Sequence, residues 1–558
     1  MSSNTQVVLR LLKLIRPWWG WMLLGSLLSL ITILANVSLM ALSGWFIATM
    51  AIAGITGASV NYFTPSAGIR AFAIIRTASR YGERLVTHEA TFRLLAALRC
   101  WFYEHLEPLA PAVLQNYRSG DLLSRIRADI DALENFYLRI LAPLFVALIS
   151  SIAIVLFLSQ YHLLIALIKL SLLAIAGVGV PLLVNQLAHQ ASVRKVETTA
   201  TLRSSIIDST QGMSELLVYG AAPAQLEKVT QLSEQLLRDQ QHLAKLNGGA
   251  QAALGLAANL SMWLILIVAI PMVSSQHLAP ANLALLALFA MASFEAIMPL
   301  PLAFQTLPGT LAAARRLFDI VDSTPAITEP PSPREMPSAF DITLNQLSLQ
   351  YPNRPTWALR NINLTIPHGN HLAIVGPSGS GKTTLINALL RFWPVSSGDI
   401  CFAGHSICQF HSEDIRAQFS LASQHSTLFN STIRRNLLLA KRDASDEAIQ
   451  NACKLAQIHD FIMTLPDTYD TWIGEAGHKL SGGQMRRLGI ARALLKPSSV
   501  LILDEPGEGL DRMTEQRMLQ AIIKHEKNRS LILITHHLIG LENMDQIIRL
   551  EQGQLVKT

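Results

Sequence analysis

The sequence predicts an α-helical membrane domain with six spans over residues 1–321, followed by an α/β domain over 340–558, with a linker at 322–339. Half of the 558 residues are hydrophobic and only 15% are charged, which is typical of an integral membrane protein with an attached soluble part. A complete phosphate-binding loop at 376–383, GPSGSGKT, follows an apolar run and precedes a helical pattern. These two observations predict the class of each domain.

Six apolar stretches reach the roughly 20 residues that are needed to cross about 30 Å of hydrocarbon. They are residues 18–50, 65–88, 136–158, 162–187, 250–273 and 281–304. The second is the least hydrophobic. Three connecting segments, 51–65, 159–162 and 274–280, contain no Lys or Arg, whereas 94–139 and 188–245 are rich in them. By the positive-inside rule, this alternation puts the N-terminus and the second domain in the cytosol.

The linker contains four prolines between 322 and 337 and is predicted to be extended and exposed. From Phe340 onward, short β-rich runs alternate with helical patterns, as expected of an α/β domain. The net charge is only +6, and the basic residues lie where the positive-inside rule places them. We therefore expect a lipid bilayer and a small molecule as partners, and no nucleic acid.

The phosphate-binding loop predicts a site for ATP and Mg²⁺. Its glycines let backbone N–H groups curl around phosphate oxygens. Lys382 is expected to reach the β- and γ-phosphates, and Thr383 is expected to offer its hydroxyl to Mg²⁺. The predicted nucleotide contacts in this loop are Gly376, Ser378, Gly379, Ser380, Gly381, Lys382, Thr383 and Thr384.

Further candidate residues follow apolar runs in the second domain. Asp504 ends one such run and is expected to hold Mg²⁺ through water, while Glu505 beside it polarises the attacking water. Gln424 is expected to contact the metal and the water, and His536 the γ-phosphate and the water. Tyr351, 25 residues before the loop, is expected to stack on adenine; the alternative is an ordinary surface aromatic.

A second motif, LSGGQ at 480–484, opens a predicted helix. A helix N-terminus of this kind suits the γ-phosphate of ATP held by another subunit. The candidate contacts in this motif are Ser481, Gly482, Gly483 and Gln484. Asp511, which follows the apolar run at 500–503, is expected to face the partner domain. With these motifs in this order, the second half resembles the nucleotide-binding domain of ABC transporters. The loop Gly-Glu-Gly at 507–509 departs from the commoner Thr-Ser form.

With six preceding spans, the whole chain resembles an ABC exporter half-transporter, whose two nucleotide-binding domains close head to tail on ATP. The segments Leu-Ser-Gly-Trp-Phe at 42–46 and 80–93 closely resemble the C subunit of the heterodimeric exporter required for bacterial cytochrome bd assembly. The resemblance implies a location in the bacterial inner membrane and a homologous D-type subunit as partner. It also implies export of reduced thiols (cysteine, glutathione) and handling of haem.

Arg76, Arg80, Arg84 and His88 recur every four residues, so they form one stripe on a helix. A cationic stripe in a membrane helix is costly and usually faces a cavity or a partner. A histidine with an arginine one turn away suits haem b, and the carboxylates of glutathione would suit the stripe as well. The alternative is a helix that continues into the cytosol with a solvated stripe. Glu295, in the last span, is expected to pair with an arginine or to face the translocation path.

Three functions remain open at this point. The first is an ATP-driven exporter that moves haem, thiols or both toward the periplasm. The second is an ATP-dependent assembly factor that loads haem without net export, and the third is a lipid or drug exporter of the same fold. The basic stripe disfavours a purely apolar drug as substrate.

Overall fold

The computed structural model describes residues 4–117, 122, 125–337, 339–352, 354–424, 426–474, 477, 479–527, 529–536 and 541–556. The chain divides into two compact units. One consists of Met1–Leu109 and Leu114–Thr324, and the other of Ala110–Val113 and Pro325–Thr558.

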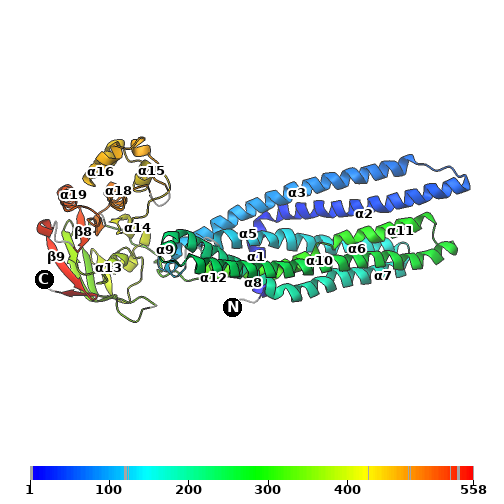
Figure 1. Cartoon of the computed structure of the whole chain (residues 1–558), viewed down its shortest axis with the longest axis horizontal. Coiled ribbons are helices and arrows are strands. Elements are labelled where there is room, and N and C mark those ends of the chain that lie inside the picture. Colours follow the sequence, from blue (N-terminus) through cyan, green and yellow to red (C-terminus); the bar gives the residue numbers. More distant parts are fainter. Residues whose placement is uncertain are drawn as a thin grey trace. The chain divides into compact units, whose positions relative to one another are not determined.

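The first unit is helical over its described residues. Its α-helices are α1 (Asn4–Ile15), α2 (Trp19–Thr56), α3 (Phe63–Leu106), α5 (Ile130–Asn135), α6 (Ala142–Ser159), α7 (Leu163–Ala174), α8 (Val180–Gln211), α9 (Met213–Val218), α10 (Ala222–Ser274), α11 (Ala281–Ala292) and α12 (Leu300–Val321). Short 3₁₀ and π segments interrupt or join them: η1 (Arg16–Trp18), η2 (Glu107–Leu109), η3 (Leu114–Asn116), η4 (Arg125–Asp129), η5 (Phe136–Leu141), η6 (Ile175–Gly179) and η7 (Ser293–Ala296). The long helices lie side by side (Figure 1), with α2 packed along α3 and α11, and α8 packed along α10 and α12.

Within the described residues, five helical segments are long and apolar enough to cross a membrane. They are Asn4–Thr56, Arg125–Ser159, Leu163–Gln211, Ala222–Ser274 and Ala281–Val321. They contain five of the six predicted spans. The predicted second span, 65–88, lies in α3, which does not meet the same criterion because charged residues such as Arg76, Arg80 and Arg84 interrupt its apolar run. Nevertheless α3 packs along α2, which places its charged side chains beside a membrane-spanning helix.

Apolar residues of the first unit divide between a core and an outer surface. Leu158, Ile165, Leu254 and Ile265 are fully buried between the helices. Large side chains on the outer faces are 48–71% exposed: Leu148, Ile152, Leu156, Leu170, Leu256, Trp263 and Ile267. Exposing such a surface to water costs about 25 cal/mol per Å², so these faces suit lipid.

The second unit contains two sheets. The larger has the strand order β10-β9-β3-β8-β7-β6, parallel throughout except for the antiparallel pair of β10 with β9. Its strands are β3 (His371–Val375), β6 (Phe419–Ala422), β7 (Val500–Asp504), β8 (Ser530–Thr535), β9 (Gln546–Glu551) and β10 (Gln554–Val556). The smaller sheet is antiparallel, with the order β2-β1-β4-β5 and the strands β1 (Ile342–Leu349), β2 (Leu359–Ile366), β4 (Ser397–Phe402) and β5 (His405–Ser406).

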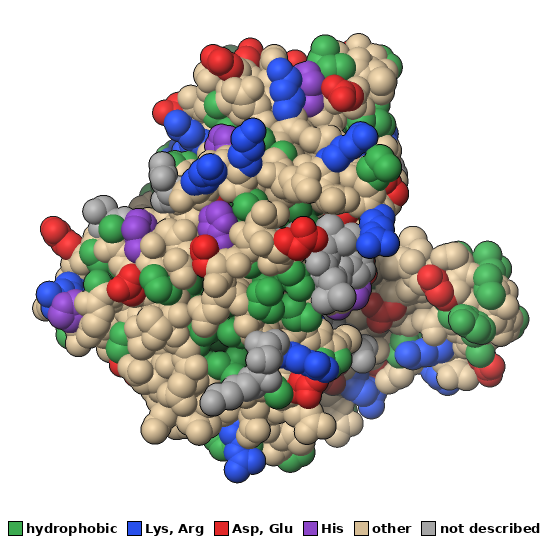
Figure 2. All heavy atoms as spheres, turned by 90° about the vertical axis from the view of Figure 1, so that its left-hand side faces the viewer, with side chains coloured by type: hydrophobic (Ala, Val, Ile, Leu, Met, Phe, Trp, Pro, Cys, Tyr) green, Lys and Arg blue, Asp and Glu red, His purple; other side chains and the backbone are tan. Residues whose placement is uncertain are grey.

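The helices of this unit pack against the sheets or against one another. They are α13 (Lys382–Leu389), α14 (Ser412–Ala417), α15 (Ile433–Leu438), α16 (Asp446–Leu455), α17 (His459–Met463), α18 (Gly482–Leu495) and α19 (Arg512–His525). The face of the molecule in Figure 2 belongs to the left-hand side of Figure 1. The described side chains visible there carry charges of both signs, which are interspersed rather than gathered into one basic field.

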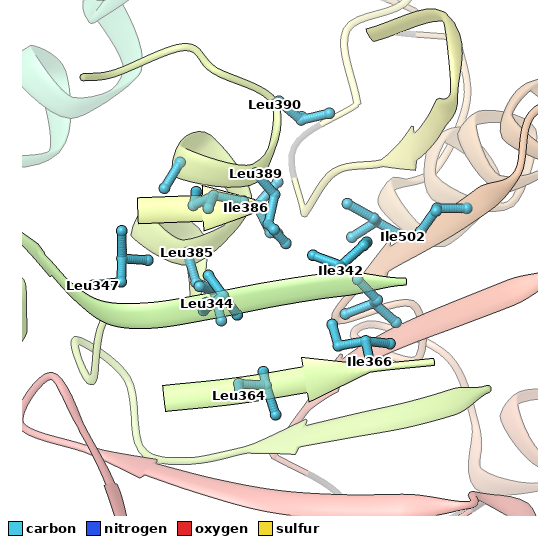
Figure 3. Packing of buried hydrophobic residues seen from close by; sticks show 14 of the residues in the cluster. Ile342, Leu344, Leu347, Leu364, Ile366, Leu385, Ile386, Leu389, Leu390 and Ile502 are labelled. Carbon is cyan, nitrogen blue, oxygen red and sulfur yellow. The ribbon is translucent and has the colours of Figure 1, made fainter. Parts of the chain in front are cut away.

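The helix that follows the phosphate-binding loop is fixed by the core. Leu385 of α13 lies beside Leu344 of β1 (Figure 3). Both side chains are buried, as is Ile386, in one core cluster that also contains Ile502 of β7. Buried aliphatic side chains of this size each contribute about 1.5–3 kcal/mol. The position of the loop is therefore set by the packing of the helix behind it.

The proline-rich stretch at the start of the second unit is held to the rest of that unit at two points. The carboxylate of Glu329 accepts a hydrogen bond from the backbone of Ser412 at 3.0 Å and forms an ion pair with Arg391 at 3.5 Å. The backbone N–H of Arg334 donates to the carbonyl of Gln409 at 2.8 Å. Although many of its residues are exposed, the stretch is docked rather than a free tether, because its polar groups find partners on the domain.

Candidate nucleotide site and membrane-domain polar cluster

The parallel sheet brings together residues that are far apart in the sequence. Val375 of β3 pairs with Thr535 of β8, Asp504 of β7 pairs with Ile534 of β8, and Ala422 of β6 pairs with Leu503. The carboxyl ends of these strands therefore meet at one edge, where ligands of α/β sheets usually bind. The phosphate-binding loop, Gln424, Asp504 and His536 all stand at or directly after these strand ends.

A cavity of about 1200 Å³ lies at this edge. The predicted residues that line it are Tyr351, Ser378, Gly379, Gly381, Lys382, Thr383, Thr384, Gln424, Asp504, Glu505 and His536. Side chains that line it without having been predicted include Arg354, Thr356, Trp357, Arg360, Glu508, Gln552 and Gln554.

Glycine is required at both ends of the phosphate-binding loop. A Cβ on Gly376 would lie 2.2 Å from the carbonyl oxygen of Leu550, and one on Gly381 would lie 2.6 Å from that of Ala358. Gly381 also has φ of +106°, which other residues rarely adopt. Gly376 and Ser380 are not among the described residues that line the cavity, and the buried Ser380 hydroxyl has no hydrogen-bond partner among the described residues. This tight backbone cradle fits a phosphate group.

Lys382 lies in the loop with its ammonium group almost completely buried. Its Nζ donates to the carbonyls of Gly376 at 2.8 Å and Pro377 at 3.0 Å, and lies 3.8 Å from Glu505 Oε1. The ammonium group of Lys382 has three N–H donors, and phosphate oxygens would offer them charged acceptors. These oxygens would lie at the N-terminus of α13, where negative charge is favoured. The arrangement therefore suits the predicted contact with the β- and γ-phosphates.

Glu505 is the centre of the predicted catalytic group. Its Oε2 accepts a hydrogen bond from Gln424 Nε2 at 3.0 Å, and its Oε1 lies 3.6 Å from His536 Nδ1. Glu505 also has φ of +51°, an uncommon conformation for a residue with a side chain, and strain of this kind often occurs at functional sites. The structure thus brings the three residues Glu505, Gln424 and His536 together.

Asp504 carries a strongly perturbed carboxyl group. Burial and then the neighbouring Glu505 raise its pKa from 3.8 to about 6, although Lys382 acts in the opposite direction. Carboxylate, hydroxyl and amide oxygens are the ligands that Mg²⁺ prefers, and the buried Asp504 carboxylate gains most from a cation. Asp504, Thr383 and Gln424 line one cavity, so this donor set fits Mg²⁺.

Tyr351 is partly fixed by its neighbours. Its hydroxyl donates to Thr384 Oγ1 at 3.2 Å, and its ring meets that of Trp393 edge-on with centroids 4.8 Å apart. Trp357, which is 43% exposed, offers a second aromatic face to the same cavity. The one indication of this role in the sequence is that Trp357 stands in a short polar stretch close to Tyr351. Stacking of adenine on Tyr351 stays a prediction.

The residues of the second motif lie elsewhere in the unit. Ser481 caps α18, and its side chain and that of Gln484 accept hydrogen bonds from each other's backbone N–H groups at 3.3 and 2.8 Å. Asp511 caps α19 by accepting from Met513 and Thr514. In the described structure none of the residues 481–484 or Asp511 lines the cavity, so one copy of the chain does not bring the two motifs together.

In the first unit, a polar cluster links three elements of the membrane domain. Arg76 of α3 donates to Asn36 Oδ1 of α2 at 2.9 Å, the Asn36 amide donates to Glu295 of η7, and Arg80 pairs with Glu295 at 3.3 Å. The predicted stripe thus divides into two halves. Arg76 and Arg80 belong to this cluster, whereas the described contacts of the cluster include neither Arg84 nor His88, which are exposed like Arg80. The His88 ring stacks on Phe92 with centroids 6.0 Å apart.

Lys169 of α7 is completely buried next to the chain segment that leads to Glu295. Its Nζ donates to the carbonyl of Ala290 at 2.8 Å and lies 3.8 Å from the centre of the Phe294 ring. Ala290 is near the end of α11, and Phe294 precedes Glu295 in η7. Lys169 therefore satisfies a carbonyl where the helix changes, and it stabilises the segment that presents Glu295.

Comparisons with known proteins agree with this geometry. Residues 359–508 match the ABC transporter family, and residues 22–297 match the ABC transporter transmembrane region. The chain is 35% identical over 539 residues to the glutathione/L-cysteine transport system ATP-binding/permease protein CydC of Escherichia coli, covering 96% of this chain and 94% of that protein. It is 30% identical over 503 residues to the corresponding CydD protein of Bacillus subtilis, covering 88% and 85%.

The fold also has a solved counterpart. The structure of a bacterial Atm1-family ABC exporter with ATP bound matches with a TM-score of 0.85 at 23% identity, covering 96% of this chain and 94% of that chain. The chain therefore belongs to the ABC transporter family. It is a half-transporter that carries a membrane region and an ATP-binding domain on one polypeptide, and it couples ATP hydrolysis to transport. The predicted fold class, enzyme class and resemblance to the C subunit are confirmed.

Proposed function

We propose that the chain pairs with a related D-type half-transporter in the bacterial inner membrane and exports small reduced thiols such as cysteine or glutathione toward the periplasm. We further propose that this transport supports the assembly of cytochrome bd. The N-terminus and the ATP-binding domain would be cytosolic, by the positive-inside rule. The full-length similarity to proteins named for glutathione and cysteine transport supports the cargo, and the similarity to both CydC and CydD supports the pairing.

The observation that carries the cargo assignment is the cluster of Arg76, Asn36, Arg80 and Glu295. Charged side chains within a membrane domain are costly, and they usually mark a substrate pathway. Arginine is suited to binding carboxylates, and a glutamate can accept from an ammonium group. Cysteine and glutathione carry both groups, so a cluster with both signs of charge fits them better than it fits a purely apolar drug or lipid.

In the motor, we propose that Glu505, His536 and Gln424 act on the attacking water. The loop residues described above and Tyr351 would bind ATP, and Ser481–Gln484 with Asp511 would act on nucleotide held by the partner. Thr383, Gln424 and Asp504 would hold Mg²⁺, which supplies charge neutralisation at the β- and γ-phosphates. Each closed site takes the phosphate-binding loop from one domain and the LSGGQ motif from another, so the chain without its partner subunit is expected to show little cargo-stimulated activity.

Transport into inverted vesicles tests the proposed cargo. Vesicles that contain the chain and its D-type partner should accumulate labelled cysteine or glutathione in an ATP-dependent way. Arg80→Ala and Glu295→Gln should each reduce uptake by roughly 10-fold or more, because hydrogen bonds to charged groups contribute about 1.5–3 kcal/mol. Glu89→Gln, on the same helix as Arg80 but paired with Arg93, is the matched control. Absence of thiol uptake together with uptake of a lipid or drug, or ATP turnover without any transport, would contradict the proposal.

Haem is a second candidate ligand, favoured by the exposure of both His88 and Arg84 one turn apart on α3. Imidazole nitrogen is a common haem ligand, and guanidinium pairs well with a propionate. We expect His88→Ala to shift or abolish the Soret band of haem b added to the purified complex. Arg84→Ala should weaken binding by roughly 1–3 kcal/mol without changing the spectrum. The same spectrum and affinity for both variants and the wild type would exclude this site.

A further inference from the structure

Glu508 occupies an unusual position at the nucleotide site. It lies in the loop after β7, lines the same cavity as Glu505, and its side chain is 45% exposed. The cavity thus has a second glutamate, Glu508, three residues after Glu505, which is the predicted catalytic carboxylate. Its contacts involve two other segments of the domain.

The first of these contacts is Arg486 of α18, whose side chain is only 12% exposed. Its NH1 donates to the backbone carbonyl of Glu508 at 2.5 Å, and its NH2 lies 2.8 Å from Glu508 Oε2. The same NH2 group donates to the backbone carbonyl of Gln424 at 2.8 Å. One arginine of the LSGGQ helix thus joins the loop after β6 to the loop after β7.

The second contact is the side chain of Gln424. Its Nε2 donates to Glu505 Oε2 at 3.0 Å and also lies 3.3 Å from Glu508 Oε2. A glutamine amide has two N–H donors, and both face carboxylate oxygens here. Because both acceptors are charged, the amide is held with its nitrogen toward Glu505 and Glu508.

We propose that Glu508 is a positioning residue that restrains ATP hydrolysis by keeping Gln424 on Glu505. A carboxylate that accepts a hydrogen bond from Gln424 is a weaker partner for an attacking water. Gln424 must leave Glu505 before both can act on that water, and the bonds from Glu508 and Arg486 oppose this movement. The inference depends on the proposed role of Glu505, and it goes beyond it by assigning a function to a residue that departs from the commoner family form.

The test is the ATPase activity of Glu508→Ala and Glu508→Gln in the complex with the partner subunit, with the partner's own site disabled. We expect Glu508→Ala to raise the kcat without cargo roughly 3- to 10-fold, the effect of losing one charge-assisted hydrogen bond at a half-exposed site. KM for ATP should stay within about twofold, and the stimulation by cargo should fall. Glu508→Gln should rise less, because its amide oxygen still accepts.

Glu413→Ala, an exposed glutamate on α14, is the control for loss of a surface charge and should leave kcat unchanged. An unchanged or lower kcat without cargo in both Glu508 variants overturns the proposal, as does a change in KM alone. Thermal unfolding of each variant identifies a folding defect, and the isosteric Glu508→Gln then decides the result. Glu505→Gln separates this inference from the site assignment: if that variant keeps its turnover, the assignment of Glu505 fails whatever Glu508 does.

Discussion

Glu505→Gln is expected to bind ATP and to lose most of its turnover, on the order of 10²-fold or more. The substitution keeps the shape of the side chain and its contact with Gln424, but it replaces the charged oxygen that would polarise the attacking water. Lys382, which lies 3.8 Å from Glu505, remains free to bind phosphate. The loss should therefore appear in kcat, with little change in the affinity for ATP.

The measurement is ATP hydrolysis and ATP binding by the complex, with the partner's site separately disabled. Glu413→Gln, which changes an exposed glutamate of the same domain in the same way, is the control. Near-normal turnover of Glu505→Gln would show that another group serves as the base. Loss of ATP binding would show instead that Glu505 organises the phosphate-binding loop.

The nucleotide site could be predicted from the sequence because each of its parts is local. The loop, Asp504 and His536 each follow an apolar strand, and parallel pairing of β3, β7 and β8 then brings the strand ends to one edge. Glu508 and Trp357 could not be assigned in the same way. Their contacts depend on how loops fold back over the cavity, and this depends on tertiary packing rather than on a repeating pattern.

The membrane domain shows the same difference. The four-residue spacing from Arg76 to His88 correctly placed these side chains on one helix, but it did not separate Arg76 and Arg80, which pair with other helical segments, from Arg84 and His88. That separation comes from Asn36 and Glu295, which belong to other helical segments. Similarly, Lys169 is buried where its ammonium group can donate to the carbonyl of Ala290. This partner lies in another helix, so the spacing of residues around Lys169 does not predict the contact.

Asp504→Asn is expected to abolish most turnover and yet to stabilise the nucleotide-free domain. The pKa of Asp504 rises from 3.8 in the unfolded chain to about 6 in the fold, because the carboxyl group is buried and lies beside Glu505. The folded state therefore favours the protonated form. The resulting stability is fully present below pH 3.8 and is lost as the pH rises through about 6. Above pH 6, the buried charge costs about 3 kcal/mol at most, the value that corresponds to this change of pKa.

Asparagine removes that cost and keeps a similar volume, so the free energy of unfolding at pH 7.5 should rise by about 1–3 kcal/mol. The gain should fall by about half between pH 7 and pH 5, because Asp504 in the folded wild type becomes protonated over that range, and it should disappear only near pH 3.8, where the unfolded chain is protonated as well. Turnover should fall by on the order of 10²-fold or more, since the charge expected to hold Mg²⁺ is lost.

Thermal unfolding of both forms without nucleotide, measured from pH 5 to pH 8, and Mg²⁺-dependent ATP hydrolysis provide the two readouts. A destabilised variant at pH 7.5, or a stability difference that does not change with pH, would contradict the raised pKa. Retained turnover would contradict the assignment of Asp504 to Mg²⁺, because a neutral amide at this position cannot offset the charge of the cation.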